Sequence, residues 1–446
     1  MKFSKFLLLV GVVLAQVNES TQSSEPSLRS LRNDLLSQEG SNPYFPYDPI
    51  RGYIDIYDKD NSMWYWLVRA RENPDTAPIV IWLEGGPGEG GSIEMVCKTG
   101  PFYVMKNFSE THPRAYLKGN TTWAQKANMV YPDFPLGCGF STVTDRGLSF
   151  SRKQVQQQIL IFFEKFLERH PEFKGRPLYV TGVSYGGHWV PYAATALKYA
   201  GNPDINVVGF YIGSGFMDIE IANESYLGWA LKNYKYTGFT ESMAPIFRKW
   251  QNLCAHLVEF GANRLYQAES YEVCFNQYYN KIVAEIQKKK PKFDGNNMPG
   301  NLTADPRPQE FLNNTQVIKF LDVRKPHFLF FNQSYFNFFI PRDLHVSMEP
   351  YLRRLLDDGV KGVFTSGTLD FITNYVQSEK TVAAVEWKGQ EVYNKKKMVP
   401  FHGGVYKEYM NLREYRVDGS GHGICTYKPE IAAEIFNSLI AWEPSP

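Results

Sequence analysis

The sequence predicts an α/β protein in which a mostly parallel central sheet carries an inserted helical cap. Strand-like apolar runs alternate with segments of helical periodicity near both ends of the chain, which is typical of a parallel sheet covered by helices. This alternation breaks between residues 223 and 314, where the sequence becomes helical, aromatic and charged. We therefore expect a core made of residues 44–222 and 315–446, with the cap at 223–314.

The composition restricts the classes of protein to which the chain can belong. Its 446 residues suffice to bury a large core and to hold an additional unit. Hydrophobic residues make up 43% and charged residues 21%, which excludes a disordered chain and a polytopic membrane protein. The 48 Lys and Arg residues nearly balance the 46 Asp and Glu residues, so the charge predicts binding neither to nucleic acid nor to an anionic membrane.

The N-terminus is typical of a secretory signal peptide over residues 1–15. Two lysines precede an apolar run from Phe6 to Leu14, and a small residue, Ala15, ends it. Residues 16–43 are rich in Ser, Asn, Gln and Glu, which predicts a flexible leader. No later segment is long and apolar enough for membrane insertion, so we expect a protein of the secretory pathway with an extracellular or a lysosomal or vacuolar destination.

Cysteines and glycosylation acceptors fit that compartment. Five cysteines permit at most two disulfides, and the preferred pair is Cys254 with Cys274, 20 residues apart in one helical-looking stretch. The other cysteines are expected to be buried and unpaired, and the absence of a Cys/His cluster in the sequence predicts no metal site. Candidate N-glycosylation sites are Asn18, Asn107, Asn120, Asn223, Asn301, Asn313 and Asn332.

Local patterns predict the elements of the core. Alternating apolar and aromatic residues over Tyr53–Val68 indicate two strands with a turn at Asp58–Asn61. A short buried strand over Ala77–Leu83 is followed by a glycine-rich loop. The later elements are a helix over Val155–Arg169, a strand over Pro177–Thr181, a helix over Trp189–Tyr199, a helix over Tyr351–Asp358, a strand over Val360–Thr365, a strand near Tyr415–Val417 and a helix over Pro429–Trp442.

A candidate nucleophile lies in Gly182-Val183-Ser184-Tyr185-Gly186, between a predicted strand and a predicted helix. In a G-x-S-x-G elbow, small flanking residues allow a sharp turn that holds the serine hydroxyl above the sheet. Ser184 is therefore the expected nucleophile. For the pentapeptide alone, an ordinary glycine-rich turn from strand to helix remains the alternative.

A nucleophilic serine needs a histidine base and a carboxylate, which follow it in the order acid, then histidine, in this arrangement. Among 8 histidines, His422 lies in a glycine-rich loop after a predicted strand, where a loop can direct an imidazole toward the serine. Asp370 follows the strand Val360–Thr365 and is the expected acid. It is preferred to three aspartates that end a helix or crowd the histidine loop, namely Asp357, Asp358 and Asp418.

The oxyanion of a tetrahedral intermediate needs backbone N–H donors that are already in place. One is expected from Tyr185, directly after the nucleophile, and one from Gly86 in the early glycine-rich loop. Phosphate binding by that loop is disfavoured, since no GxxxxGK[ST] pattern follows and Pro87 has no N–H.

Five segments of the chain carry motifs in a fixed order, namely Trp82–Gly88, Asp133–Ser141, Gly182–Pro191, Ser366–Asp370 and Gly419–Pro429. They resemble, in the same order, the motifs W-L-N-G-G-P-G, D-Q-P-x-G-x-G-F-S, G-E-S-Y-A-G-x-Y-x-P, S-G-D-x-D and G-A-G-H-M-V-P-x-D-Q-P of the serine carboxypeptidases of the α/β-hydrolase fold. The resemblance extends from about Tyr53 to Trp442. The resemblance implies a secreted or vacuolar exopeptidase that removes C-terminal residues, often at acidic pH, under a helical cap. It also supports Ser184, Asp370 and His422 as the triad.

The chain departs from this pattern where such enzymes hold the terminal carboxylate of the substrate. The family's Asn is Glu84 here, its elbow Glu is Val183, and the Glu before its N-G-P is Lys98. An ionised Glu84 beside Gly85 would repel a carboxylate. Two hypotheses follow for this substrate-binding region: Lys98 binds the carboxylate directly, or a Glu84–Lys98 ion pair closes the subsite. The family's Met after the histidine is Gly423, which suggests a reshaped leaving-group pocket.

Three functions are compatible with these residues. The favoured one is a serine-type carboxypeptidase that hydrolyses peptides through an acyl-enzyme, without a metal or an organic cofactor. The second is an acyltransferase or esterase with the same chemistry and an altered specificity. The third is a catalytically inactive secreted binding protein on the same scaffold. We expect a peptide substrate and either a monomer or a homodimer.

Overall fold

The computed structural model describes residues 43–443 apart from 106–108, 110, 146, 150, 261–266 and 299–304. The predicted signal peptide, all but the last residue of the predicted leader, and the candidate glycosylation sites Asn18, Asn107 and Asn301 lie outside the described residues. None of the helices in the described ranges is long and apolar enough to cross a lipid bilayer.

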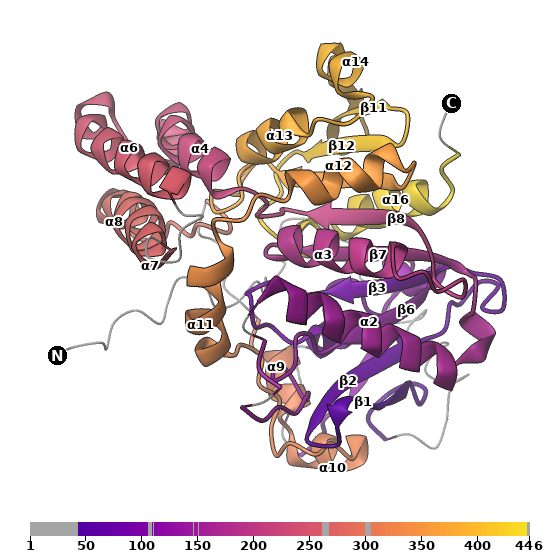
Figure 1. Ribbon diagram of the computed structural model, residues 1–446. Coiled ribbons are helices and arrows are strands. Elements are labelled where there is room, and N and C mark those ends of the chain that lie inside the picture. The colour runs from indigo at the N-terminus through magenta and orange to yellow at the C-terminus, as the bar shows by residue number, and fades with distance from the viewer. Residues whose placement is uncertain are drawn as a thin grey trace.

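A ten-stranded sheet forms the centre of the protein, with the strand order β1-β2-β6-β3-β7-β8-β9-β12-β11-β10 (Figure 1). Neighbouring strands from β6 through β12 in this order are parallel, whereas the pairs β1–β2, β2–β6, β12–β11 and β11–β10 are antiparallel. This confirms the predicted fold class. The strands are β1 (Ile50–Asp58), β2 (Asn61–Val68), β3 (Ile79–Leu83), the separate pair β4 (Phe102–Val104) and β5 (Ala115–Leu117), β6 (Asn128–Pro132), β7 (Pro177–Val183), β8 (Asn206–Gly213), β9 (Lys361–Gly367), β10 (Val399–Phe401), β11 (Gly404–Tyr409) and β12 (Leu412–Val417).

The helices are α2 (Arg152–Arg169), α3 (Gly186–Lys198), α4 (Ile219–Lys232), α5 (Tyr234–Thr237), α6 (Ala244–Phe260), α7 (Gln267–Tyr271), the π-helical η6 (Glu272–Tyr279), α8 (Asn280–Lys289), α9 (Arg307–Leu312), α10 (Thr315–Leu321), α11 (Gln333–Asp343), α12 (Glu349–Asp357), α13 (Tyr375–Ala384), α14 (Gln390–Lys395), α15 (Ile424–Tyr427) and α16 (Pro429–Ile440). Short 3₁₀ turns are η1 (Gly91–Val96), η2 (Trp123–Gln125), η3 (Pro171–Phe173) and η4 (Glu241–Met243).

Helices cover both faces of the sheet, so the central strands are buried on both sides. Along β3, Ile79, Ile81 and Leu83 pack in one core with α2 and α3, because successive side chains of a strand point to opposite faces. Val80 and Trp82 pack in the second core with α16. This two-sided burial explains why the β3 sequence is continuously apolar rather than alternating.

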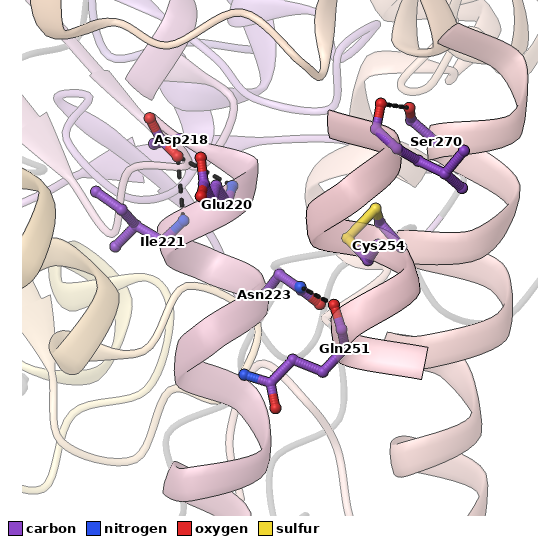
Figure 2. The surroundings of a disulfide bond; sticks show 9 residues. Asp218, Glu220, Ile221, Asn223, Gln251, Cys254 and Ser270 are labelled. Atoms are coloured by element: carbon purple, nitrogen blue, oxygen red, sulfur yellow. Dashed lines mark hydrogen bonds between the residues drawn. A yellow bond between two sulfur atoms is a disulfide. The ribbon is translucent and has the colours of Figure 1, made fainter. Parts of the chain in front are cut away.

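The segment between β8 and β9 holds the helices that we predicted as a cap. In Figure 1, α4, α6, α7 and α8 cluster to one side of the sheet, beyond the ends of its strands, and α9 and α10 lie near β1 and β2 at one edge of the sheet. The predicted disulfide between Cys254 of α6 and Cys274 of η6 is present and fastens two helices of this cluster (Figure 2). Helix α4 begins at Ile219, and further helices follow residue 314 before β9. The predicted cap boundaries at residues 223 and 314 therefore stay a prediction.

The candidate glycosylation sites differ in exposure, and Asn223 is the most buried of those that the structure describes. Its side chain is buried between α4 and α6, where Nδ2 donates a hydrogen bond of 3.0 Å to the Gln251 carbonyl (Figure 2). A glycan on that nitrogen does not fit the folded protein. Asn313 and Asn332 are half-buried, and their amide nitrogens also donate to backbone carbonyls. Asn120 is exposed and remains the acceptor that the fold accommodates best.

Candidate active site

Ser184 stands at a sharp turn between β7 and α3. Its φ of 62° lies in the left-handed region, which residues other than glycine rarely adopt. A Cβ at Gly182 would lie 2.5 Å from the Leu83 carbonyl oxygen, so only glycine fits there. The turn is held because the Ser184 amide donates to the Gly213 carbonyl, 3.0 Å away. Ser184 is half-buried, whereas the residues on both sides of it are buried. The elbow thus presents this hydroxyl at the rim of the sheet.

The helix after the elbow begins at Gly186, three residues before the predicted start. The chain turns back immediately, since the Gly187 amide donates to the Ser184 carbonyl at 2.9 Å. The same carbonyl accepts from the Phe216 amide at 2.9 Å. The elbow is therefore tied to the segment after β8 as well as to its own helix.

Asp370 and His422 form a buried acid–imidazole pair. Asp370 follows β9 and His422 follows β12, which is the parallel neighbour of β9. His422 Nδ1 lies 2.9 Å from Asp370 Oδ2, and both residues are almost fully buried. With Nδ1 facing the carboxylate, the ring is oriented with Nε2 on its far side. Because β7, β8, β9 and β12 are consecutive parallel strands, Ser184, Asp370 and His422 all emerge at the carboxyl edge of the sheet.

Thr373 supports this pair and was not predicted from the sequence. Its hydroxyl donates to Asp370 Oδ2 at 2.7 Å and lies 2.8 Å from His422 Nδ1. Its amide donates to the other carboxylate oxygen at 3.1 Å. From the other side, the His422 amide donates to the Asn296 carbonyl at 2.7 Å. The position of Thr373, three residues after the acid, is the signal that could have identified it.

The glycine-rich loop after β3 lies directly against the nucleophile. A Cβ at Gly85 would be 2.7 Å from the Ser184 Cβ, which requires glycine there. Gly86 has a φ of +105° and precedes a cis peptide bond to Pro87. In the described part of the chain, the amides of Gly86 and Tyr185 donate to no backbone carbonyl. These two amides remain the candidate oxyanion donors.

Beside this loop, Lys98 is enclosed by carboxylates. Its Nζ lies 3.1 Å from Glu84 Oε1 and 3.0 Å from Glu94 Oε1, with all three side chains at most 4% exposed. The other oxygen of Glu84 accepts from the indole N–H of Trp82 at 3.0 Å. Glu94 was not predicted, although its spacing of four residues from Lys98 is a signal for an ion pair on one helical turn. The ammonium group of Lys98 is thus paired with two buried carboxylates of the protein itself.

Burial and charge shift the titration of this cluster. Burial raises the pKa of Glu84 to about 7 against the opposing charge of Lys98, and it raises the pKa of Glu89 to about 8. Burial is the largest influence on Glu94 and acts to raise its pKa, but the charge of Lys98 and the hydrogen bonds with Glu84, Lys98 and the Thr99 amide together outweigh it and lower the net pKa. Burial acts to lower the pKa of Lys98, yet the surrounding carboxylates hold it well above its usual value. The cluster therefore takes up protons on acidification while Lys98 stays charged.

A small internal cavity adjoins this cluster and the candidate catalytic residues. Its water-accessible volume is ≈ 10 Å³, about that of one water molecule. Two of the residues that line the cavity are Val183, which precedes Ser184, and Gly423, which follows His422. Its lining is Trp82, Lys98, Val183, Tyr211, Gly213, Gly423, Ile424 and Cys425. In the described ranges, no group of three or more His, Cys, Asp or Glu side chains is arranged to hold a metal ion.

The raised pKa values predict that the protein is more stable at pH 5 than at pH 8. Buried Glu84, Asp133 and Glu414 have pKa values near 7, and Glu89 near 8, above the values of about 4 expected in the unfolded chain. Between pH 4 and pH 8 the folded state binds more protons than the unfolded chain does. The free energy of unfolding therefore falls as pH rises, by at most about 1.4 kcal/mol per pH unit for each site. Thermal unfolding at several pH values measures this slope.

Glu89→Gln removes one of these groups and should flatten the pH dependence of the melting temperature. Glu172→Gln, at a partly exposed surface carboxylate, serves as the control and should leave the slope unchanged. A melting temperature that is constant or rises from pH 5 to pH 8 would show that these carboxyls do not titrate as described.

Comparisons with known proteins place these motifs in context. A family model described as "Serine carboxypeptidase" matches residues 41–442. Serine carboxypeptidase-like 48 of Arabidopsis thaliana is 29% identical over 87% of this chain and 77% of its own length. Carboxypeptidase S1 of Penicillium janthinellum is 25% identical over 88% of this chain and 95% of its own. The solved structure of the prohormone-processing carboxypeptidase Kex1ΔP of Saccharomyces cerevisiae superposes with a TM-score of 0.73 at 20% identity, over 88% of this chain and 90% of that one, and shows the same fold.

Proposed function

Because this chain belongs to the serine carboxypeptidase family, we propose that it is a serine-type carboxypeptidase that removes C-terminal residues from peptides. The observation that carries this proposal is the pairing of His422 with Asp370 at the same sheet edge as the strained elbow of Ser184. A strained serine turn and a buried, oriented imidazole are the parts that acyl transfer needs.

In the proposed mechanism, His422 accepts the proton of the Ser184 hydroxyl while Oγ attacks the carbonyl carbon of the last peptide bond. The amides of Gly86 and Tyr185 stabilise the oxyanion. His422 then gives its proton to the leaving amine, which departs as the C-terminal amino acid and leaves an acyl-enzyme on Ser184. A water molecule then attacks the ester while His422 accepts its proton, and His422 returns that proton to Ser184 Oγ as the bond from Oγ to the acyl carbon breaks and the shortened peptide leaves. Asp370 holds the imidazole in the required tautomer and orientation.

Of the two hypotheses for Lys98, the contacts support the ion pair that closes the subsite. Two carboxylates occupy the ammonium group at 3.1 and 3.0 Å, and the adjoining cavity is too small for a terminal carboxylate. We therefore propose that Lys98 does not bind the substrate's C-terminal carboxylate. Such a subsite also favours the second candidate function, acyl transfer or ester hydrolysis by the same triad, because these reactions do not require recognition of a free carboxylate.

We expect Lys98→Met to leave KM for a free-acid peptide within about twofold of the wild-type value, because KM reports binding that the substrate makes with the site. The same change should lower the free energy of unfolding by about 3–5 kcal/mol, since it leaves two buried carboxylates without their cation. The double variant Lys98→Met/Glu84→Gln removes part of that penalty and keeps the kinetic test possible. A tenfold rise of KM for the free acid, but not for its amidated twin, would instead assign carboxylate binding to Lys98.

Labelling with a fluorophosphonate probe separates an enzyme from an inactive binding protein. The probe reacts with an activated serine, so we expect labelling of the wild type at Ser184 and no labelling of Ser184→Ala or His422→Ala. Absence of labelling in the folded wild type would favour the binding protein. Partition of the acyl group between water and an added amine or alcohol then distinguishes hydrolysis from acyl transfer.

We further propose that the protein works in the secretory pathway, outside the cell or in a lysosome or vacuole. The apolar N-terminal run, the disulfide between Cys254 and Cys274 and the exposed acceptor at Asn120 support this location. The predicted stability at acidic pH supports an acidic destination. Release of the protein into the medium of expressing cells, with a mobility shift that Asn120→Gln removes, would test it.

A further inference from the structure

Helix α11 connects the two loops that carry the candidate oxyanion donors. At its N-terminal end, the Asn332 amide donates to the Gly88 carbonyl at 2.9 Å, and the Gly90 amide donates to the Phe330 carbonyl at 3.0 Å. Residues 330–332 are thus paired with the loop of Gly86. In Figure 1, α11 runs from the neighbourhood of α9 toward the cluster of α4, α6, α7 and α8. Its last residue is Asp343.

Asp343 contacts three residues of the elbow helix and its start. Its Oδ2 accepts from the Tyr185 hydroxyl at 2.7 Å and lies 2.9 Å from His188 Nδ1. Its Oδ1 accepts from the Tyr192 hydroxyl at 2.8 Å. All four residues are buried. The rings of Tyr185 and His188 are also stacked, with their centroids 4.6 Å apart. These contacts fix the ring of Tyr185 from two directions.

The carboxylate is suited to act as a rigid anchor. Burial acts to raise the pKa of Asp343, but its contacts with His188 and the two tyrosine hydroxyls outweigh burial and lower the pKa. The group is therefore ionised, and hydrogen bonds to an ionised acceptor are about twice as strong as neutral ones. Tyr185 is the residue directly after Ser184, and its amide donates to no backbone carbonyl in the described part of the chain.

We propose that Asp343 is a positioning residue for the oxyanion hole: through α11 it fixes the Tyr185 amide at a set place relative to the Gly86 loop. The inference rests on the proposed function, in which these two amides stabilise the oxyanion. An N–H donor stabilises a transition state only if it is oriented before the reaction. A carboxylate at the end of α11 that is bonded to the side chain of the donor residue supplies that orientation.

The test compares Asp343→Asn with the wild type in the full-length protein, with all rates expressed per titrated active site. We expect kcat for a peptide to fall about tenfold with KM changed by less than about twofold, since a displaced donor costs less than the 10²–10³-fold loss that follows its removal. The rate of Ser184 phosphonylation by a fluorophosphonate should fall in parallel, because negative charge also develops on the phosphonyl oxygen. A purely structural role would lower the fraction of active protein but not the rate per active site.

Two further variants make the test independent of folding losses. Tyr185→Phe removes one hydrogen bond to Asp343 while keeping the ring and the amide, and should lower kcat about threefold to tenfold. Tyr192→Phe also removes a hydrogen bond to the Asp343 carboxylate, but the Tyr192 amide is not one of the proposed oxyanion donors. This variant should therefore change kcat less than Tyr185→Phe does. Unchanged rates per active site in Asp343→Asn, or equal losses in the two tyrosine variants, would overturn the inference alone. Failure of the folded wild type to label at Ser184 would overturn the proposed function and this inference with it.

Discussion

Replacing Ser184 by alanine is expected to lower kcat for peptide hydrolysis by about a million-fold, the loss typical of removing the nucleophile of a serine hydrolase. The alanine variant keeps the candidate oxyanion donors and the His422–Asp370 pair, so the remaining rate reports what those groups achieve without covalent catalysis. The measurement is a comparison of single-turnover rates at equal enzyme concentrations.

Ser214 provides a matched control for this substitution. It is a buried serine near the same sheet edge, just after β8, and it also has a positive φ, of 45°. Ser214→Ala should retain kcat within about threefold, because this serine has no role in the proposed chemistry. A Ser184→Ala variant that keeps more than a few per cent of the wild-type rate would show that another residue is the nucleophile.

Asp370→Asn is expected to lower kcat by about ten-thousand-fold, because an amide in place of the carboxylate favours the wrong tautomer of the histidine. The structure gives this expectation a specific basis: Asp370 Oδ2 lies 2.9 Å from His422 Nδ1 and also accepts from Thr373. The loss should appear in kcat, with KM changed little, because Asp370 is buried and does not face the substrate.

Asp294→Asn controls for a general loss of negative charge near His422. Asp294 interacts with the imidazole through its charge, and its carboxylate accepts hydrogen bonds from Asn296, whose carbonyl in turn accepts from the His422 amide. We expect its effect on kcat to be less than about tenfold. The kcat of Thr373→Val should lie between those of the two aspartate variants, because this change removes the hydroxyl that contacts both Asp370 and His422. Equal losses for Asp370→Asn and Asp294→Asn would contradict the assigned role of Asp370.

Much of the fold could be predicted because its elements are encoded locally. The pattern around Asp58–Asn61 indicated the turn between β1 and β2, and the apolar run of β3 indicated a strand buried on both faces. The pairing of β9 with β12 and the antiparallel edge strands could not be predicted, because they depend on contacts between distant parts of the chain. For the same reason the Asn-X-Ser pattern made Asn223 a glycosylation candidate, although packing of α4 against α6 buries it.

In the candidate site, too, some residues have a local signal in the sequence and others do not. Ser184 is marked by its own neighbours in the sequence, since the sharp turn that holds it leaves no room for a side chain at Gly182. Asp370 and His422 were recognisable as residues after strands, and the structure brings them within 2.9 Å of each other. Asp343 carried no local signal, because its partners lie more than 150 residues away in the sequence and meet it only after α11 packs against α3.

The measurement that tests the central claim most directly is a mass-spectrometric time course on an N-terminally blocked peptide at mildly acidic pH, with Ser184→Ala as the control. We predict that the wild type shortens the peptide by single residues from the C-terminus, and that the variant leaves it intact. If the wild type labels with a fluorophosphonate but leaves the peptide intact or cuts it internally, the protein is a serine hydrolase of another specificity and the carboxypeptidase assignment is wrong.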